Sequence, residues 1–241
     1  MMGWMILRRM KRCLPYLPFA AIVIGILLIS LTGVRHELTF KHVAEQHQQL
    51  LSFVTERPVL APLMFVGVYI LSVCFVIPDS IFLSILAGFL FPYPLAVIYI
   101  VFSETIGAWL FFEATHTALR PATHKIRNRH FSRLKAEISL DQANYLLFCR
   151  FSHLFPFWLV NTAAAVVPVK RWTFIWTTAL GVLPFAFVLA EGGKSLAHYF
   201  KTHAHFTIDA VFTTDVKLML VGFGVLALVP VLWKRARRKR A

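Results

Sequence analysis

The sequence has few charged residues and few cysteines, and each shortage excludes a class of protein. Only 15% of the 241 residues are charged, whereas 58% are hydrophobic. A soluble fold of this length has too little interior to bury so much apolar surface, so lipid must cover part of it. The cysteines are Cys13, Cys74 and Cys149. Their number is odd and Cys74 lies in an apolar run, so no disulfide framework is indicated.

The sequence also lacks the short motifs that would indicate catalysis. It contains no P-loop, no G-x-S-x-G, no H-E-x-x-H and no C-x-x-C. His198, His203 and His205 lie near one another, but no cysteine or carboxylate spacing supports a metal site, and we interpret them as loop histidines. We therefore expect no enzyme, no metal and no cofactor.

Long uncharged runs account for most of the apolar content. Residues 14–32, 151–169, 172–190 and 218–233 carry no charge, and residues 58–112 carry only two carboxylates. About 20 apolar residues are needed for a helix to span the hydrocarbon core of a bilayer. Several of these runs meet that length. The sequence therefore predicts an all-α integral membrane protein.

The charge is strongly one-sided, with 25 Lys and Arg against 11 Asp and Glu. The basic residues cluster at residues 8–12, 120–135 and 234–240, and each cluster flanks an apolar run. Positively charged segments of this kind mark cytoplasmic loops and tails of membrane proteins. We therefore expect a membrane surface and no nucleic acid as the partner of these charges.

The first apolar run begins directly after a basic segment. Its start resembles a signal peptide, but the run is long and residues 30–33 are not a typical cleavage site, so we interpret it as an uncleaved span. The N-terminus would then be cytoplasmic, and residues 33–57 would lie outside. This gives a first unit, residues 1–57, with one transmembrane helix and an outer loop.

The charge pattern then requires the chain to turn back inside the membrane. If both 58–77 and 94–118 crossed fully, the basic segment 120–135 would lie outside. The conflict disappears if residues 58–92 form a hairpin that enters and leaves on the outer side, turning near Pro78. Residues 94–118 then cross inward.

The second half allows the same interpretation from the opposite side. Residues 144–168 would form a hairpin from the cytoplasmic face that turns near Pro156, residues 171–193 would cross outward, and residues 214–233 would return. Four full spans and two opposed re-entrant hairpins result, with both termini cytoplasmic. Between the halves, residues 124–140 fit either an amphipathic helix on the inner surface or a solvated loop.

The two halves share a weak internal repeat. Pro78 aligns with Pro156, each is followed nine residues later by an alanine, and the next spans carry Gly107 and Gly181. Inverted repeats with broken helices that meet near the midplane are typical of transporters. Backbone freed by a proline at membrane depth needs protein or a wet cavity around it. The pattern therefore predicts a sheltered polar cavity.

Three ionisable residues in these runs are the candidates for transport or proton transfer: Asp79, Glu104 and Arg150. A charge at the centre of a span costs roughly 2.5–3.5 kcal/mol, so it normally faces the interior and has a partner. A carboxylate could carry a proton and the arginine could bind an anion or phosphate. The alternative is a structural ion pair between Arg150 and one carboxylate.

For Glu113, His153 and Glu191, nearer the predicted ends, the structural interpretation is favoured. Asn161 is expected to brace a turn by bonding free backbone groups.

Residues 150–161 and the span that follows carry the most specific pattern. An arginine, a Pro-Phe pair and an asparagine precede Phe174, Thr178, Gly181 and Pro184. This resembles the second signature of the VTT-domain family, the DedA-related group also called SNARE-associated Golgi proteins. The first half matches more loosely, through Pro78, residues 87–91 (which include Gly88), Gly107, Ala108 and Phe112.

The resemblance covers about residues 60–196. It implies a VTT/DedA-like domain at 58–196, followed by a C-terminal helix and basic tail at 197–241. It also implies opposed hairpins whose structural residues are Pro78, Gly88, Gly107, Pro156, Asn161, Gly181 and Pro184.

The resemblance implies lipid translocation, as scrambling or as proton-linked transport of a lipid carrier that supports envelope homeostasis. The partners would be membrane lipids, through anionic head groups or a lipid carrier, and self-association into a homo-oligomer stays open. Short tails and basic termini are typical of a multi-pass protein of a bacterial inner membrane. Two other functions remain open from the residues themselves: a small-ion or proton-coupled solute transporter, and a membrane scaffold that transports nothing.

Overall fold

All regular secondary structure in the described part of the chain is helical. The computed structural model describes residues 47–202, apart from 78, 124–140, 153–154 and 168, together with Leu218. Its helices are α4 (His47–Glu56), α5 (Leu60–Cys74), α6 (Ser80–Leu90), α7 (Tyr93–Thr123), α9 (Gln142–Ser152), α10 (Phe157–Val166) and α11 (Arg171–Thr202). The prediction of an all-α fold is confirmed for these residues.

Several predicted features fall on other parts of the chain. The spans at 14–32 and 214–233, the segment 124–140, Pro78 and His153 lie outside the described residues.

The chain reverses direction between α5 and α6. The ring of Phe65, early in α5, meets that of Phe91, just after α6, edge to face at 5.3 Å. Nearer the turn, the hydroxyl groups of Tyr69 and Ser84 are 2.6 Å apart. The contacts run in opposite order along the two segments, so the helices are antiparallel. Val76, in the connection, has φ of +56°, a value that β-branched residues rarely adopt.

The chain reverses again between α9 and α10. Close to the turn, Nη2 of Arg150 donates to Oδ1 of Asn161 at 3.1 Å. At the far end, the backbone N–H of Lys170 donates to Oε1 of Gln142 at 2.9 Å. Pro156 has the extended backbone that its ring favours and stands directly before α10. The break in the helical pair therefore lies next to the proline from which it was predicted.

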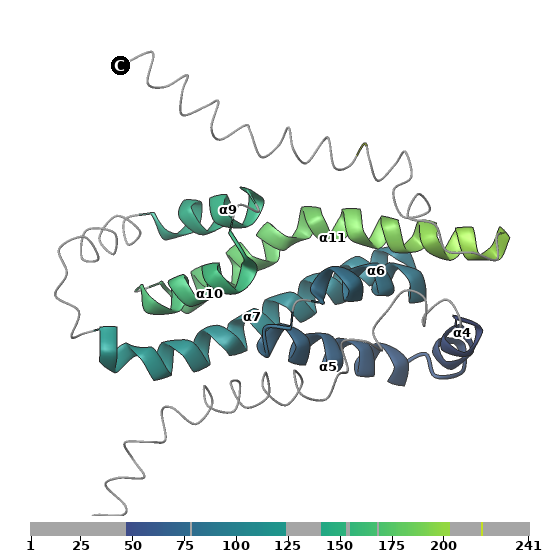
Figure 1. Ribbon diagram of the computed structural model, residues 1–241, viewed down its shortest axis with the longest axis horizontal. Coiled ribbons are helices and arrows are strands. Elements are labelled where there is room, and N and C mark those ends of the chain that lie inside the picture. Colours follow the sequence, from purple (N-terminus) through teal and green to yellow (C-terminus); the bar gives the residue numbers. More distant parts are fainter. Residues whose placement is uncertain are drawn as a thin grey trace, which may run out of the picture.

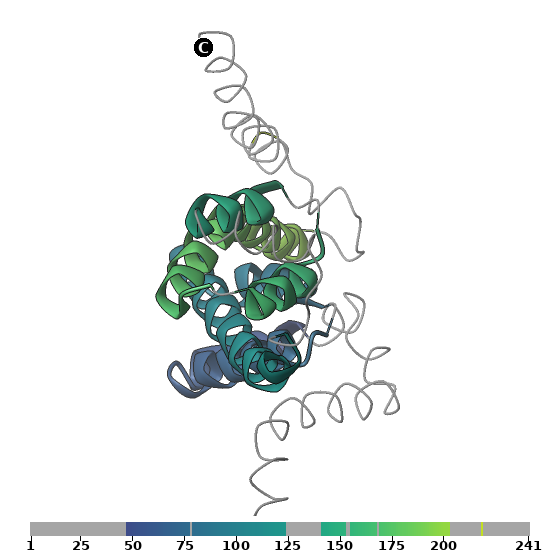
Figure 2. The same cartoon turned by 90° about the vertical axis from the view of Figure 1, so that its left-hand side faces the viewer.

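The two helix pairs exchange partners across the molecule. α5 packs on α7 and α9 packs on α11, so the first helix of each pair stays with the long helix of its own half. α6 instead packs mainly on α11, and α10 mainly on α7. The long helices also contact each other. Figure 1 shows α6 and α10 along the long helices, and Figure 2 shows the described helices gathered into one bundle.

Glycines allow the closest of these contacts. A Cβ on Gly88 of α6 would overlap the backbone carbonyl of Ala190 in α11, and a Cβ on Gly193 would overlap that of Ile85 in α6. Backbone cannot move aside as a flexible side chain can, so only glycine fits at both positions. The small residues hold α6 and α11 at close range, as in many membrane helix pairs.

Two described helices are long and apolar enough to cross a bilayer. They are the segments Tyr93–Leu119 of α7 and Arg171–Tyr199 of α11. α4 and α5 together would make a third candidate, but the chain bends by 115° between them. Large apolar side chains are exposed on the outside of the bundle, including Leu63 and Ile98, each more than half exposed. The described helices therefore present a surface suited to lipid.

Candidate functional site

A pocket of about 420 Å³, called here the polar pocket, lies where both halves meet. Its volume falls within the range of roughly 300–1,000 Å³ that is usual for ligand sites. Glu104 of α7 and Arg150 of α9 both line it. The remaining wall is contributed by Ser80, Ile81, Cys149, Phe155, Pro156, Phe157, Val160, Gly181, Val182 and Phe185. Two of the three predicted transport residues therefore share one cavity.

Arg150 is buried with hydrogen-bonding capacity left over. Its side chain is only 5% exposed, and the guanidinium lies 5.1 Å from the ring centres of both Phe157 and Phe174. Nη2 donates to Asn161, but Nε and Nη1 have no hydrogen-bond partner among the described residues. An unsatisfied buried donor costs about 1–3 kcal/mol, and more when it is charged. The arrangement is therefore suited to an acceptor that enters the pocket.

Gly181 gives Arg150 the space it occupies. A Cβ at Gly181 would lie 2.7 Å from Cβ and Cδ of the arginine. Gly107 does the same in the first half, where a Cβ would lie 2.7 Å from Cβ of Val73. The glycines carried by the two long helices thus stand at corresponding joints, α7 with α5 and α11 with α9. Of the other residues assigned structural roles, Pro184 lies inside α11.

Glu104 is held by hydroxyl groups of the first helix pair. The hydroxyl of Tyr69 lies 2.8 Å from Oε1 of Glu104, 2.6 Å from Oγ of Ser84 and 3.1 Å from the backbone oxygen of Ser80. Tyr69 and Ser84 are completely buried. A tyrosine hydroxyl both donates and accepts, so it can join the carboxylate to the serine. The result is a short polar chain from α6 to the pocket.

Asp79 stands apart from this pair. It is half-buried at the start of α6 and accepts a hydrogen bond from Oγ of Ser72. It does not line the polar pocket, although its neighbour Ser80 does. Asn161 also has a partner that was not predicted, because its Oδ1 accepts a hydrogen bond from the Arg150 guanidinium. The sequence pattern therefore located the charged residues but not their connections.

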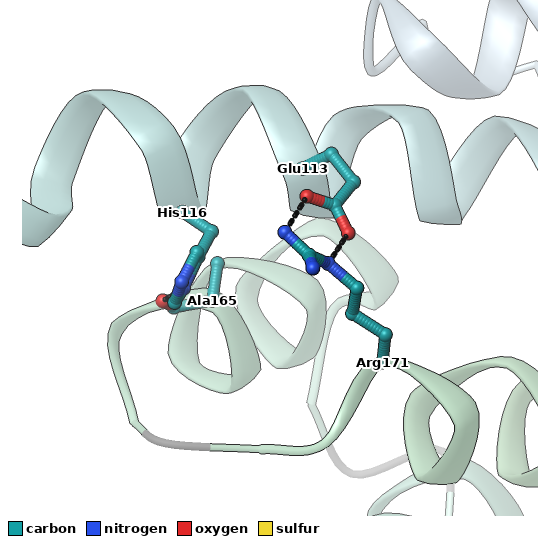
Figure 3. A network of polar contacts seen from close by, with 4 residues as sticks. All are labelled: Glu113, His116, Ala165 and Arg171. Atoms are coloured by element: carbon teal, nitrogen blue, oxygen red, sulfur yellow. Dashed lines mark hydrogen bonds and ion pairs between the residues drawn. The ribbon is translucent and has the colours of Figure 1, made fainter. Parts of the chain in front are cut away.

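A second polar network ties α7 to the end of α10 and to the start of α11 (Figure 3). Arg171 contacts both carboxylate oxygens of Glu113, through Nε at 2.5 Å and Nη2 at 3.1 Å. Nδ1 of His116 lies 2.9 Å from the carbonyl oxygen of Ala165. A carbonyl can only accept, so the histidine nitrogen must donate. At the other end of α11, Glu191 pairs with Lys194 at 2.8 Å.

The sequence reasoning missed the hydroxyl residues of the site. Tyr69, Ser72 and Ser84 stand in apolar runs and are not among the residues that the sequence pattern singles out. Tyr69 and Ser80 are eleven positions apart, and Tyr69 and Glu104 are 35 apart, so no local spacing indicates the contacts. A tyrosine and serines within otherwise apolar helices were the available signal, because a buried hydroxyl needs a partner.

Comparison with known proteins gives a consistent result. Residues 77–195 match the family model of the VTT domain. The transmembrane protein 41 homolog of Caenorhabditis elegans is 29% identical over 171 residues, covering 70% of this chain and 67% of that protein. Transmembrane protein 41B of Xenopus tropicalis is 30% identical over 175 residues, and that of Homo sapiens 28% over 179.

These alignments cover most of this chain and a smaller share of its relatives. The frog alignment covers 71% of this chain and 61% of the relative, and the human alignment 73% and 60%. The chain thus spans about three fifths of the length of these vertebrate relatives. No solved structure matches the chain. The domain match and the named relatives agree: this chain is a membrane protein of the VTT-domain family.

Proposed function

We propose that this protein moves a lipid or a lipid carrier between the two leaflets of a membrane and so supports the upkeep of the cell envelope. The observation that carries the proposal is Arg150, buried in the polar pocket with two nitrogens that have no described partner. Arginine matches the geometry of phosphate oxygens and can bind two of them at once. A phosphate-bearing head group would complete its hydrogen bonding.

Glu104 gives this pocket a second charge of opposite sign. An entering phosphate would be attracted by Arg150 and repelled by an ionised Glu104, so protonation of the carboxylate would favour entry. Release of the proton would favour exit. The Tyr69 and Ser84 hydroxyls next to Glu104 offer a route for that proton. Lipid movement would then be linked to proton movement, with Glu104 as the titrating group and Asp79 as a second candidate.

The proposed topology places the pocket inside the bilayer. Four full spans would surround two re-entrant pairs, α5–α6 from the outer side and α9–α10 from the cytoplasmic side. The partner exchange, α6 with α11 and α10 with α7, supports a repeat inverted across the membrane. Both termini would be cytoplasmic in a bacterial inner membrane.

Single cysteines introduced by Arg57→Cys and Tyr93→Cys in a background without Cys13, Cys74 and Cys149 test the first pair. Labelling of both from the outer side is expected, and labelling from opposite sides would remove the basis for the hairpin.

The transport proposal is tested by reconstitution. The purified protein in liposomes should accelerate the exchange of fluorescent phospholipids or of an undecaprenyl-type lipid between leaflets. Liposomes without protein, and liposomes with a heat-inactivated sample, set the background. Rates equal to this background, with the protein shown to be folded after reconstitution, would refute lipid translocation.

A proton-coupled solute or small-ion transporter is the second candidate, and the chain from Ser84 through Tyr69 to Glu104 favours it. Ion or proton flux without movement of lipid would select this function. A scaffold that transports nothing is separated by variants. Arg150→Ala should abolish transport and Asp79→Asn should reduce it while the protein stays folded, whereas in a scaffold any loss of function should follow loss of stability.

A further inference from the structure

A second pocket, of about 260 Å³, lies between α9 and α10, and is called here the apolar pocket. Leu146, Leu159, Ala164 and Val167 belong to its wall, and none of the described wall residues is charged. An apolar void offers water too few hydrogen-bond partners, so it tends to stay dry and to accept hydrocarbon. Its chemistry is the opposite of that of the polar pocket.

The two pockets are neighbours. Cys149, Phe155 and Val160 line both of them, so the polar pocket with Arg150 and the apolar pocket share three wall residues. A ligand that fills both must be charged at one end and apolar at the other. A soluble anion would satisfy Arg150 but leave the apolar pocket empty, whereas a lipid fits both compartments.

The apolar pocket also has exposed apolar residues in its wall. Phe155 and Leu159 are 47% and 39% exposed, and Tyr145 is 44% exposed. These residues belong to the surface that would meet the membrane in the proposed topology. A hydrocarbon chain could therefore enter from the bilayer without crossing water.

We propose that the apolar pocket holds one hydrocarbon chain of an anionic phospholipid whose phosphate binds Arg150 in the polar pocket. The proposal rests on the proposed function and adds to it a site for the chain. In this arrangement α9 and α10 bind the acyl chain, and the head group binds between the two halves. Retention should then depend on chain length and not only on head-group charge.

The test is photo-crosslinking of the full-length protein in phosphatidylcholine liposomes. The probe is a phosphatidylglycerol with a diazirine in one acyl chain, and the adducts are located by peptide mass spectrometry. We expect adducts to concentrate on α9 and α10. An equal spread over exposed apolar residues that line neither pocket, such as Leu63 and Val68 of α5, would overturn the proposal.

Matched variants on α10 sharpen the result. Ala164→Phe fills the apolar pocket and should lower adduct formation there by roughly tenfold, the factor expected when about two buried methylene groups lose their site. Thr162→Phe, on the same helix but lining neither pocket, should leave it unchanged. If Ala164→Phe does not fold, Ala163→Phe replaces it, because Ala163 is exposed and also lines the apolar pocket. Equal labelling of the filled variant and Thr162→Phe would contradict the chain site.

Competition separates the chain from the head group. Unlabelled long-chain phosphatidylglycerol should suppress the adducts, and soluble glycerol 3-phosphate should do so far less well. Equal suppression by both would show that the apolar pocket adds nothing. Because crosslinking reports binding without translocation, site-specific adducts together with background transport rates would refute the proposed function and leave the chain site standing. Transport without site-specific adducts would do the reverse.

Discussion

The two halves of this protein use the same succession of helices to hold charges of opposite sign. In α5–α6–α7 the carboxylates of Asp79 and Glu104 accept hydrogen bonds from the hydroxyl groups of Ser72 and Tyr69. In α9–α10–α11 the guanidinium of Arg150 has one amide partner, two aromatic faces and two nitrogens without a described partner. The carboxylates of the first half thus have partners within that half, whereas the buried arginine of the second half has two donors without a described partner.

The carboxylates therefore have their hydrogen bonds made within the protein, whereas the Arg150 guanidinium can still donate to a ligand. Buried polar groups are normally hydrogen-bonded, so an exception in a cavity indicates a ligand or water. In the proposed function, the second half would therefore bind the anion and the first would handle the proton. Glu104 and Arg150, which would carry these roles, line the same pocket.

The largest effect, on stability, is expected from disrupting the packing of α6 on α11. Gly193→Leu places a side chain against the backbone of α6, which should lower the free energy of unfolding by about 3 kcal/mol or more. Gly67→Leu is the matched control, because a Cβ on Gly67 has no neighbouring atom within 4 Å. Thermal unfolding in detergent measures both. Equal stability of the two variants would show that α6 and α11 do not need close contact.

The next effect concerns the charge of the second half. Arg150→Lys keeps the charge but loses the planar set of donors, so lipid exchange in liposomes should slow by about 10- to 100-fold, the loss of one or two charged hydrogen bonds. Glu104→Gln should slow exchange less, because the amide oxygen still accepts from Tyr69. If Glu104→Gln slowed lipid exchange more than Arg150→Lys, the carboxylate of the first half would matter more for transport than the guanidinium, contrary to the proposal.

A smaller effect should follow from removing the hydroxyl that serves Glu104. Tyr69→Phe leaves the buried ring in place but deprives the carboxylate and Ser84 of a partner, which should cost about 1–3 kcal/mol in the free energy of unfolding. Tyr99→Phe is the matched control, because the Tyr99 hydroxyl makes no hydrogen bond to a described residue. Chemical denaturation compares them, and an equal cost would mean that the network adds no stability.

The smallest effect is expected for Glu113→Gln. The pair with Arg171 is short, but the arginine side chain is 68% exposed, and exposed ion pairs add little to stability. The midpoint of thermal unfolding should be unchanged at low and at high salt. A clear, salt-dependent loss would show that this pair joins the halves more firmly than its exposure implies.

The helices themselves were largely predictable from the sequence. The spans expected at 94–118 and 171–193 correspond to α7 and α11. The segments 58–92 and 144–168 contain α5–α6 and most of α9–α10. Length and charge suffice here because a bilayer accepts only long apolar helices or backbone that is otherwise satisfied. The site was only half predictable. Glu104 and Arg150 stand out as rare charges in apolar runs, but Tyr69 and Ser84 do not.

By itself, the sequence determined that this chain is helical, lies in a membrane and carries isolated charges at depth, since these properties follow from local composition. Only the tertiary structure decided which charges share a cavity. Glu104 and Arg150 both line the polar pocket, in a bundle where α6 and α10 each pack on the long helix of the opposite half, and Asp79 does not line it. Such contacts depend on shape and on glycines that let backbones touch, and a pattern read along one chain does not contain them.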